Sequence, residues 1–261
     1  MKRYRFFLFI LLIIIFLFTV PACKSTYPNS LSDTPNIDLI KAKGKIVMLT
    51  NSEFPPFEYI GHAGKIEGID VDVANEIAKD LGVDLEIIDM NFDFLIDSIK
   101  SNKGDFVAAG LTITPERQEQ VLFSIQYVTS SQYMIIKKGS SLTPDNLKNS
   151  TIAVQEATKG DFYATDDLEC ENILRFNGAV EASQALISGK CDAVILDELP
   201  ARSIVDANYN VVDIFPTALT SESYAFAIQN NKTDLCNAID NTLNRLISEG
   251  KINEFILNHD Q

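Results

Sequence analysis

The stretch KIVMLTNSEFPPFEYIGHAGKIEGIDVDVANEIAKDLGVDLEII, residues 45–88, decides the fold. Its first six residues have the apolar, β-branched character of a strand, and Pro55-Pro56 excludes a helix from the loop that follows. Apolar residues then recur at helical spacing from Val71 to Leu81, and Gly82 marks the end of that helix. Residues 85–88 form a second apolar strand. The order strand, helix, strand predicts a βαβ unit with parallel strands.

The same order continues along the chain and then repeats. A helix over 94–99 and a strand over 106–109 extend the first unit. In the second half, strands are predicted over 151–154, 193–196 and 224–228, and helices over 182–187, 235–247 and 252–256. This pattern predicts two α/β lobes with mostly parallel sheets. Because such sheets bind ligands beyond the carboxyl ends of their strands, we expect a ligand cleft between the lobes.

The N-terminus has the features of an export signal. Basic residues at positions 2, 3 and 5 precede an unbroken apolar run from Phe6 to Phe18. A bilayer-spanning helix needs about 20 apolar residues, whereas the apolar core of a secretory signal has roughly 7–15. Residues 19–23, Thr-Val-Pro-Ala-Cys, resemble the end of a bacterial lipoprotein signal. We therefore expect a signal peptide over 1–22 and a lipid on Cys23, with an uncleaved signal anchor or a signal without lipid as the alternatives.

Residues 23–35 contain Lys24, three serines and two prolines and little that could be buried, and we expect them to form a flexible tether. The chain has 22 Lys+Arg and 36 Asp+Glu, a net charge of -14. Removing the three basic residues of the signal leaves 19 against 36, so the net charge of the mature chain is -17. A surface this acidic argues against nucleic acid or an anionic lipid surface as a partner.

Three cysteines remain after Cys23, namely Cys170, Cys191 and Cys236, so at most one disulfide can form among them. Buried small hydrophobic residues and one structural bridge are both open interpretations. The chain has only two histidines and no Cys-x-x-Cys pair, which argues against a zinc site. We expect no metal and no cofactor.

The segment Ala109-Gly110-Leu111-Thr112-Ile113-Thr114-Pro115-Glu116-Arg117 is the most informative for chemistry. Gly110 follows a strand and lets the backbone approach a ligand closely. Thr114 is placed to cap a short helix that Pro115 begins. Arg117 then lies near the cleft, where its planar guanidinium matches a carboxylate by two parallel hydrogen bonds. A surface arginine is the competing interpretation of the same pattern.

Four segments together resemble the bacterial extracellular solute-binding protein family 3, the polar amino acid receptors of ABC importers. They are residues 54–58 (FPPFE), 68–74 (GIDVDVA), 110–117 (GLTITPER) and 191–197 (CDAVILD). The match runs from about Lys43 to the C-terminus in the family's order and spacing. The resemblance implies a two-lobed periplasmic-binding-protein-like fold of type II, with two crossings between the lobes and the ligand in the cleft. It also implies an extracytoplasmic protein and an ABC permease as partner.

The domain boundaries follow from combining the pattern with this resemblance. We expect residues 36–127 and 222–261 to form the first lobe and residues 132–217 the second. The crossings, at 128–131 and 217–222, would act as a hinge that closes the lobes around the ligand. We expect the protein to be a monomer.

The resemblance also implies a pocket. Arg117 should pair with the ligand α-carboxylate, helped by Thr112 and by the backbone near Ala109 and Gly110. Asp197 should accept the α-ammonium. In the second lobe Thr158 should donate to the carboxylate, with Gln155 and Lys159 beside it, although the family usually has Gly where Ala157 stands. Phe54 and Phe92 should wall the ligand side chain, unless they are ordinary core residues.

These parts suit binding without turnover. A zwitterion needs an anion receptor, a cation receptor and walls, whereas catalysis would also need a positioned acid, base or nucleophile. Neither His62 nor His259 falls in a cleft motif, and no Gly-rich phosphate loop is present. A dehydratase on the same scaffold and a sensory domain for a membrane receptor are the alternative functions.

The identity of the amino acid is less determined. Glu53, Asp93 and Glu156 flank the pocket motifs, which favours a cationic ligand such as arginine or lysine. Against this, Asn51 stands where some receptors for basic amino acids have an acid. Selectivity should lie with the walls and with residues such as Asn51, Glu53 and Gln155.

Overall fold

The computed structural model describes residues 35–259. The predicted signal peptide, the lipidated Cys23 and the tether as far as residue 34 lie outside the described residues, so they stay predictions. Within residues 35–259, no helix is long and apolar enough to cross a membrane.

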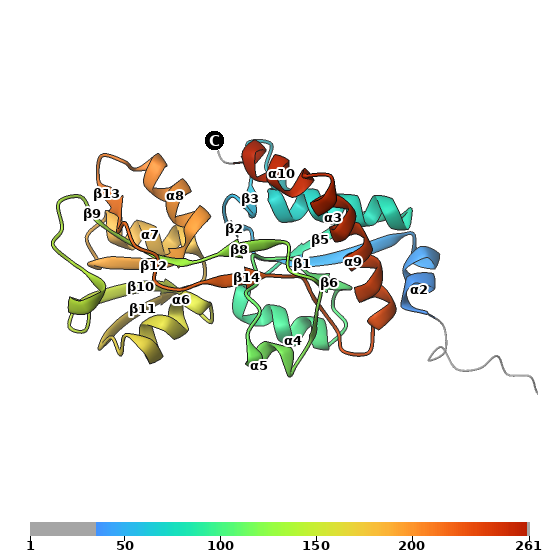
Figure 1. The fold of residues 1–261 in the computed structure, drawn as a ribbon, viewed down its shortest axis with the longest axis horizontal. Helices are drawn as coiled ribbons and strands as arrows, with labels where there is room; N and C mark the ends of the chain where they lie inside the picture. Colours follow the sequence, from blue (N-terminus) through green and yellow to red (C-terminus); the bar gives the residue numbers. More distant parts are fainter. Residues whose placement is uncertain (1–34, 260–261) are drawn as a thin grey trace, which may run out of the picture. The chain divides into compact units, whose positions relative to one another are not determined.

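Two five-stranded sheets form the centres of two lobes (Figure 1). The first sheet has the order β5-β1-β6-β15-β7. Its strands β1, β5 and β6 are parallel, whereas β15 runs antiparallel to both β6 and β7. The strand bounds are β1 Lys45–Thr50, β5 Asp84–Asp89, β6 Phe106–Val107, β7 Leu122–Phe123 and β15 Ala227–Ile228.

The second sheet has the order β11-β10-β12-β9-β13. Strands β10, β11 and β12 are parallel, and β9 runs antiparallel to both β12 and β13. The bounds are β9 Gln132–Lys137, β10 Thr151–Gln155, β11 Asn172–Phe176, β12 Ala193–Asp197 and β13 Val212–Ile214. Both sheets are therefore mixed. The sequence pattern predicted the parallel strands except β11, together with the run that contains antiparallel β15, and it missed the antiparallel strands β7, β9 and β13.

Two antiparallel strands cross between the lobes, and they lie between the two sheets in Figure 1. They are β8 (Val128–Ser130) and β14 (Glu222–Tyr224). Residues just before β14 still lie against the second sheet, because Leu219 N donates to Gln132 O at 2.8 Å. We therefore define lobe one as residues 35–127 and 225–259, and lobe two as residues 131–221.

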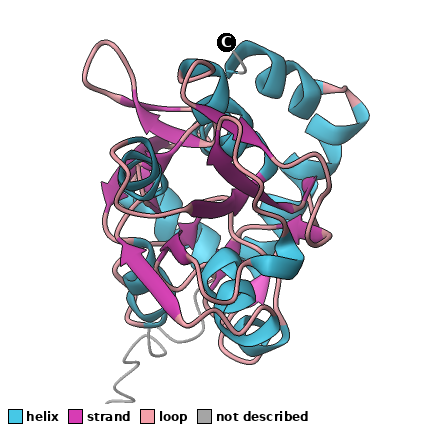
Figure 2. Ribbon diagram, turned by 90° about the vertical axis from the view of Figure 1, so that its left-hand side faces the viewer, coloured by secondary structure: helices cyan, strands magenta, loops and turns pink. Residues whose placement is uncertain are grey.

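Helices cover the strands of each lobe (Figure 2). Lobe one contains α2 Asn36–Lys43, α3 Ile69–Leu81, η2 Phe92–Phe94, α4 Leu95–Lys100, α5 Pro115–Gln118, α9 Thr233–Ser248 and α10 Lys251–His259. Lobe two contains η3 Pro144–Asn146, α6 Lys159–Phe162, η4 Tyr163–Asp167, α7 Ala179–Ile187 and α8 Glu198–Ala207. Each long helix directs one apolar stripe to the core; the buried residues of α9, for example, include Leu235, Ile239, Leu243 and Leu246.

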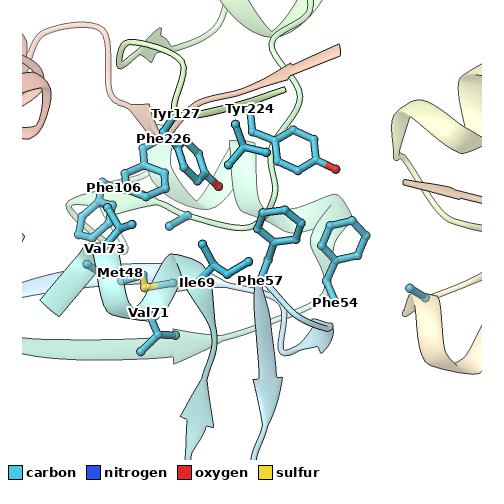
Figure 3. Packing of buried hydrophobic residues seen from close by; sticks show 14 of the residues in the cluster. Met48, Phe54, Phe57, Ile69, Val71, Val73, Phe106, Tyr127, Tyr224 and Phe226 are labelled. Atoms are coloured by element: carbon cyan, nitrogen blue, oxygen red, sulfur yellow. The ribbon is translucent and has the colours of Figure 1, made fainter. Parts of the chain in front are cut away.

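Lobe one also contains a small three-stranded sheet beside the region between the lobes. It consists of β2 Glu53–Phe54, β3 Glu58–Ile60 and β4 Ile66–Glu67. Its Phe57 is fully buried, and its ring contacts the edge of Tyr224 at a centroid distance of 5.2 Å. Figure 3 shows Phe54, Phe57 and Tyr224 together at one end of the apolar core of lobe one. This packing joins the small sheet to the crossing strand β14.

One predicted strand is divided in the structure. The apolar run 224–228 belongs partly to β14 and partly to β15, with Ala225 and Phe226 between them. The run reads as a single strand because every one of its side chains is buried. Its first residue ends the crossing ribbon, whereas its last two enter the first sheet. Burial alone cannot reveal that change of partner.

The three cysteines of the described part are free thiols. Cys191 and Cys236 are buried and Cys170 is partly exposed. Burial raises the pKa of the Cys191 thiol to about 11, so this thiol is neutral and unreactive at physiological pH. Of the two open interpretations, the structure supports small buried side chains rather than a disulfide.

A pair of buried carboxyl groups lies in lobe one. Asp70, at the start of α3, accepts hydrogen bonds from Tyr127 Oη and from the Gly110 amide, the latter at 3.0 Å. Glu58 is fully buried, and neither of its carboxyl oxygens has a hydrogen-bond partner. Burial and the nearby Asp70 carboxylate raise the pKa of Glu58 well above 4.5. Burial likewise raises the pKa of Asp70 to about 6.

These raised pKa values predict how stability depends on pH. The folded chain holds both protons more tightly than the unfolded chain does, so this part of its stability is complete at low pH. It is lost as the pH rises from about 4 through the folded pKa values. Glu58→Gln removes one of the two acids, and one pKa unit corresponds to about 1.4 kcal/mol. The variant should exceed the wild type in free energy of unfolding by about 1 kcal/mol or more at pH 8, and by less at pH 5.

Urea unfolding at both pH values measures this difference. Glu119→Gln, at an exposed position of lobe one, is the control and should change stability little at either pH. Equal stability of wild type and Glu58→Gln at pH 8 would contradict the raised pKa of the buried Glu58 carboxyl.

Candidate functional site

The segment after β6 turns toward lobe two and carries the arginine. Thr112 forms an isolated bridge with Tyr224, and Ile113 N donates to Ser223 O at 2.9 Å, so this loop is tied to the crossing strand β14. Thr114 caps α5 as predicted, because its side chain accepts from the Arg117 amide at 3.2 Å. The cap and Pro115 fix the short helix that presents Arg117.

The Arg117 guanidinium is buried between the two lobes. Its Nη1 donates to Thr112 O at 2.8 Å within lobe one, and its Nη2 donates to Ala157 O of lobe two at 3.1 Å. Its Cζ lies 5.4 Å from the centre of the Phe92 ring, in a cation–π arrangement. The side chain therefore contacts both lobes, and the surface-arginine interpretation is wrong.

Ala157 accepts that bond from an unusual backbone conformation. Its φ is 61°, in the left-handed region that favours glycine. This is the position at which the resemblance implied a glycine. The left-handed turn is retained with alanine, and it directs the Ala157 carbonyl toward Arg117.

Asp197 lies at the end of β12 and is buried. Its Oδ1 accepts a hydrogen bond from the Tyr224 hydroxyl. Burial, together with the nearby Glu222 carboxylate, raises the pKa of Asp197 to about 7. Burial also lowers the pKa of Arg117 to about 10, while Asp197 and Glu222 act in the opposite direction. One buried cation and two buried acids thus lie within electrostatic reach of one another.

Glu222 is a residue of this group that the sequence analysis did not identify. It is buried at the start of β14, and Thr112 Oγ1 donates to its Oε2 at 2.9 Å. Gln132 Nε2 also donates to Oε2, at 3.3 Å, and Thr220 Oγ1 donates to Oε1 at 2.6 Å. These donors come from both lobes, so Glu222 lies where the chain crosses between them. In the sequence, only its position in the expected crossing segment 217–222 pointed to Glu222. That position does not indicate that the side chain is buried.

A cavity of about 880 Å³ adjoins Arg117. Thr112, Arg117, Phe92 and Lys159, all predicted site residues, line it. Its acidic lining consists of Asp93, Glu116, Asp166 and Glu222, and its basic lining of Arg117 and Lys159. Four acids against two bases make the cavity anionic.

Other predicted residues form a second group that does not line this cavity. Gln155 Nε2 donates to Asn51 Oδ1 of the other lobe at 2.8 Å and to Asn177 O at 3.0 Å. Thr158 caps α6 by accepting from Asp161 N at 3.3 Å, and it donates to Gln155 O at 2.7 Å. Asn51, Gln155 and Thr158 therefore form a buried polar contact between the lobes.

The remaining predicted residues lie at the edges of these groups. Phe54 is buried against Phe57, with ring centroids 5.8 Å apart, and a Cβ on Gly110 would lie 2.5 Å from its ring. Ala109 is buried in the core, so it can offer only its backbone. Glu53 is exposed at the rim, beside Glu181 of lobe two, and together they line a separate hollow of about 610 Å³.

Within residues 35–259, no group of three or more His, Cys, Asp or Glu side chains is arranged to hold a metal ion. Both histidines lie away from the cavity lining. The cavity therefore has one buried guanidinium, Arg117, one buried carboxyl group, Glu222, and the aromatic face of Phe92 in its lining, whereas the buried Asp197 carboxyl does not line it.

Comparisons with known proteins find relatives in both sequence and fold. The family model described as "Bacterial extracellular solute-binding proteins, family 3" matches residues 46–258. The chain is 30% identical over 239 residues to a probable histidine-binding protein of Campylobacter jejuni, covering 90% of this chain and 89% of that protein.

Two solved structures have the same fold. One is the arginine-bound form of truncated ArgBP from T. maritima, which is 38% identical with a TM-score of 0.77 and covers 80% of this chain and 99% of its own. The other is an amino acid ABC transporter substrate-binding protein from Streptococcus pneumoniae bound to L-arginine. It is 29% identical with a TM-score of 0.81 and covers 87% of this chain and 98% of its own. The predicted two-lobed periplasmic-binding-protein fold is confirmed.

The left-handed conformation of Ala157 predicts the effect of a glycine there. A non-glycine residue in the left-handed region destabilises the folded chain by about 1–2 kcal/mol. Glycine removes that strain, but its greater freedom in the unfolded chain lowers stability by about 0.5–1 kcal/mol. Ala157→Gly should therefore raise the free energy of unfolding by about 0.5–1 kcal/mol, as measured by urea unfolding.

Ala238→Gly, within helix α9, is the matched control. The same exchange at a helical φ should lower stability by about 1 kcal/mol. Destabilisation by both substitutions would contradict the strain assigned to Ala157.

Proposed function

The chain belongs to the bacterial extracellular solute-binding proteins, family 3, and we propose that it captures a free amino acid between its lobes for an ABC importer. The observation that carries this proposal is the burial of Arg117 between the lobes, within electrostatic reach of the carboxyl groups of Asp197 and Glu222. The family consists of binding proteins rather than enzymes, in agreement with the absence of a catalytic pattern in the sequence.

Arg117 supplies the carboxylate receptor. In the described arrangement, two of its N–H groups are bonded to the carbonyl oxygens of Thr112 and Ala157. A guanidinium has five N–H donors, so others are free to form charge-assisted hydrogen bonds to a ligand carboxylate. Phe92 holds the plane of the guanidinium from one side. The side chain is thus oriented before a ligand arrives, which lowers the entropic cost of binding.

Asp197 supplies the ammonium receptor. Its Tyr224 partner comes from the crossing strand β14, which fixes the direction of the carboxyl group. A ligand ammonium beside it would stabilise the ionised form and offset its burial. Receptors for the two charges of a zwitterion therefore come from different lobes, because Arg117 belongs to lobe one and Asp197 to lobe two.

The anionic lining supports a cationic side chain on the ligand. Asp93 and Glu222 line the same cavity as the apolar side chains of Phe92 and Ile96, which suits a ligand side chain with an aliphatic stem and a charged end. The compared structure from T. maritima is an arginine-bound form, and that from S. pneumoniae is bound to L-arginine. We propose arginine first and lysine second. The Campylobacter relative, named for histidine, is consistent with a cationic or basic ligand.

The remaining parts of the proposal follow from the family. The closed, ligand-bound chain would be the form that the permease recognises, with β8 and β14 as the hinge. The mature protein would be a monomer held at the extracytoplasmic face of the membrane by a lipid on Cys23. Mass measurement of the processed N-terminus tests that anchor.

Titration calorimetry of the mature protein against all twenty amino acids tests the proposed function. The protein should be unfolded and refolded first, because a captured ligand can survive purification. We expect the strongest binding with arginine or lysine. Heat from none of the twenty would contradict amino acid capture, and tight binding of glutamate alone would contradict the cationic preference.

Removal of the guanidinium should abolish most of the affinity. Arg117→Met leaves the ligand carboxylate without its charged partner, at a cost of about 2–5 kcal/mol, or roughly 30-fold or more in Kd. Arg202→Met is the control, because Arg202 also stacks on an aromatic ring, Tyr133, but on α8. Wild-type affinity in Arg117→Met would exclude the arginine as the carboxylate receptor.

The raised pKa of Asp197 predicts pH-dependent affinity. Only the ionised carboxyl attracts the ligand ammonium, and burial together with Glu222 raises the pKa of this group to about 7. Affinity should therefore be constant above pH 8 and should fall below pH 7, by up to about tenfold per pH unit. Calorimetry between pH 5.5 and 8.5 measures this dependence, and Asp197→Asn should bind weakly without it. The same affinity at pH 5.5 and 8 in the wild type would contradict the role of Asp197.

A further inference from the structure

The Glu53 side chain of lobe one lies against the start of helix α7 of lobe two. A Cβ built on Gly178, the residue before α7, would lie 1.7 Å from Glu53 Oε2, 2.4 Å from Glu53 Cδ and 2.7 Å from Glu53 Cβ. Non-bonded carbon atoms settle at about 3.5–4.0 Å. The lobes thus approach each other here more closely than any residue with a side chain at position 178 would allow.

The backbone that carries Glu53 is held firmly. Ser52, its neighbour, donates through both its amide, at 2.9 Å, and its hydroxyl, at 2.7 Å, to the Asp89 carboxylate at the end of β5. On the other side, Glu53 pairs with Tyr59 in the small antiparallel sheet. The backbone of Glu53 therefore cannot move away from lobe two without disturbing two sheets.

The backbone around Gly178 is held equally well. Asn177 O accepts from the Gln155 side chain at 3.0 Å, and Gly178 O accepts from Ala182 N as the first bond of α7. Gln155 is the same residue that bonds Asn51 of lobe one. Residues 51–53 of one lobe and residues 155, 177 and 178 of the other thus meet as one contact zone.

Gly178 has no conformational need to be glycine. Its φ of -138° and ψ of 156° are extended backbone that any residue adopts. It also caps α7 without a side-chain hydrogen bond, where Ser, Thr, Asn or Asp would cap the helix better. The reason for a glycine at position 178 is therefore steric, because a side chain there would clash with Glu53.

We propose that the Glu53–Gly178 contact sets how far the two lobes close, and that this pair thereby tunes ligand affinity without touching the ligand. The proposal rests on the proposed function, since it treats closure as the step that retains an amino acid. It assigns Glu53 a positioning role at the rim in place of the ligand contact expected from the sequence. If the closed state becomes less populated, the apparent affinity falls by the same factor.

The test begins with Gly178→Ala. The added methyl group should hold the lobes apart, weakening amino acid binding by about tenfold or more in titration calorimetry. The same variant should have a larger radius of gyration than the wild type in small-angle X-ray scattering. Loss of capping by Ala also lowers the stability of α7, so a second change is needed to separate the two effects.

Glu53→Ala in the Gly178→Ala background provides that separation. It removes the two closest atoms of the contact and leaves only the Cβ, 2.7 Å away, so it should restore part of the affinity and part of the compact radius. Glu53→Gln in the same background keeps the size and removes only the charge, so it should restore neither. A capping defect in α7 would persist in both double variants.

Equal affinity and equal radius of Gly178→Ala and wild type would overturn the proposal, as would equal rescue by Ala and Gln. Failure of the wild type to bind any amino acid would instead refute the proposed function. In that event the radii of the wild type and the three variants still decide whether this contact limits closure.

Discussion

The burial of the Arg117 guanidinium is the constraint on which the rest of this structure depends. A buried cation is costly unless its hydrogen bonds are made and its charge is balanced. Here carbonyl groups of both lobes accept its bonds, and Asp197 and Glu222 oppose the effect of burial on its pKa. None of these partners lies near Arg117 by local sequence except Thr112. The fold must therefore bring two sheets and a crossing strand together to satisfy one side chain.

The two-lobe topology brings the charged partners of Arg117 together. The loop after β6 leads to Arg117, and the end of β12 carries Asp197, so each lobe presents one charge at the carboxyl end of a strand. The crossing strand β14 supplies Glu222 and Tyr224 between them. Since the proposed receptors sit on separate lobes, an amino acid that carries both charges would be held best when the lobes meet. Recognition and closure would then be the same physical event.

The sequence predicted the parts of this arrangement that depend on local chemistry. Thr114-Pro115 before Arg117 is a capping pattern, and it forms as expected. Most parallel strands were predictable because they are short, apolar runs between helices, whereas β11 was not, because most of its residues are exposed. The antiparallel strands β9 and β13 were not, because nothing in their residues states which neighbour they pair with. The resemblance showed that the family usually has glycine at position 157. The left-handed φ of Ala157 explains that preference.

Other features depended on contacts between residues distant in the chain. Glu222 looks like a solvated acid in sequence, and only the crossing of the lobes buries it. Glu53 was expected in the pocket because it adjoins a pocket motif. The alternation of side chains along β2 buries Phe54 and leaves Glu53 exposed at the rim, where it meets Gly178. A period of two cannot by itself tell which face of a short strand lies toward the ligand.

The most direct measurement for the central claim is a crystal structure of the mature protein with a bound amino acid. The account predicts the α-carboxylate within hydrogen-bond distance of the Arg117 guanidinium, and the α-ammonium beside Asp197. A ligand whose carboxylate lies elsewhere, with Arg117 still bonded only to protein groups, would contradict it.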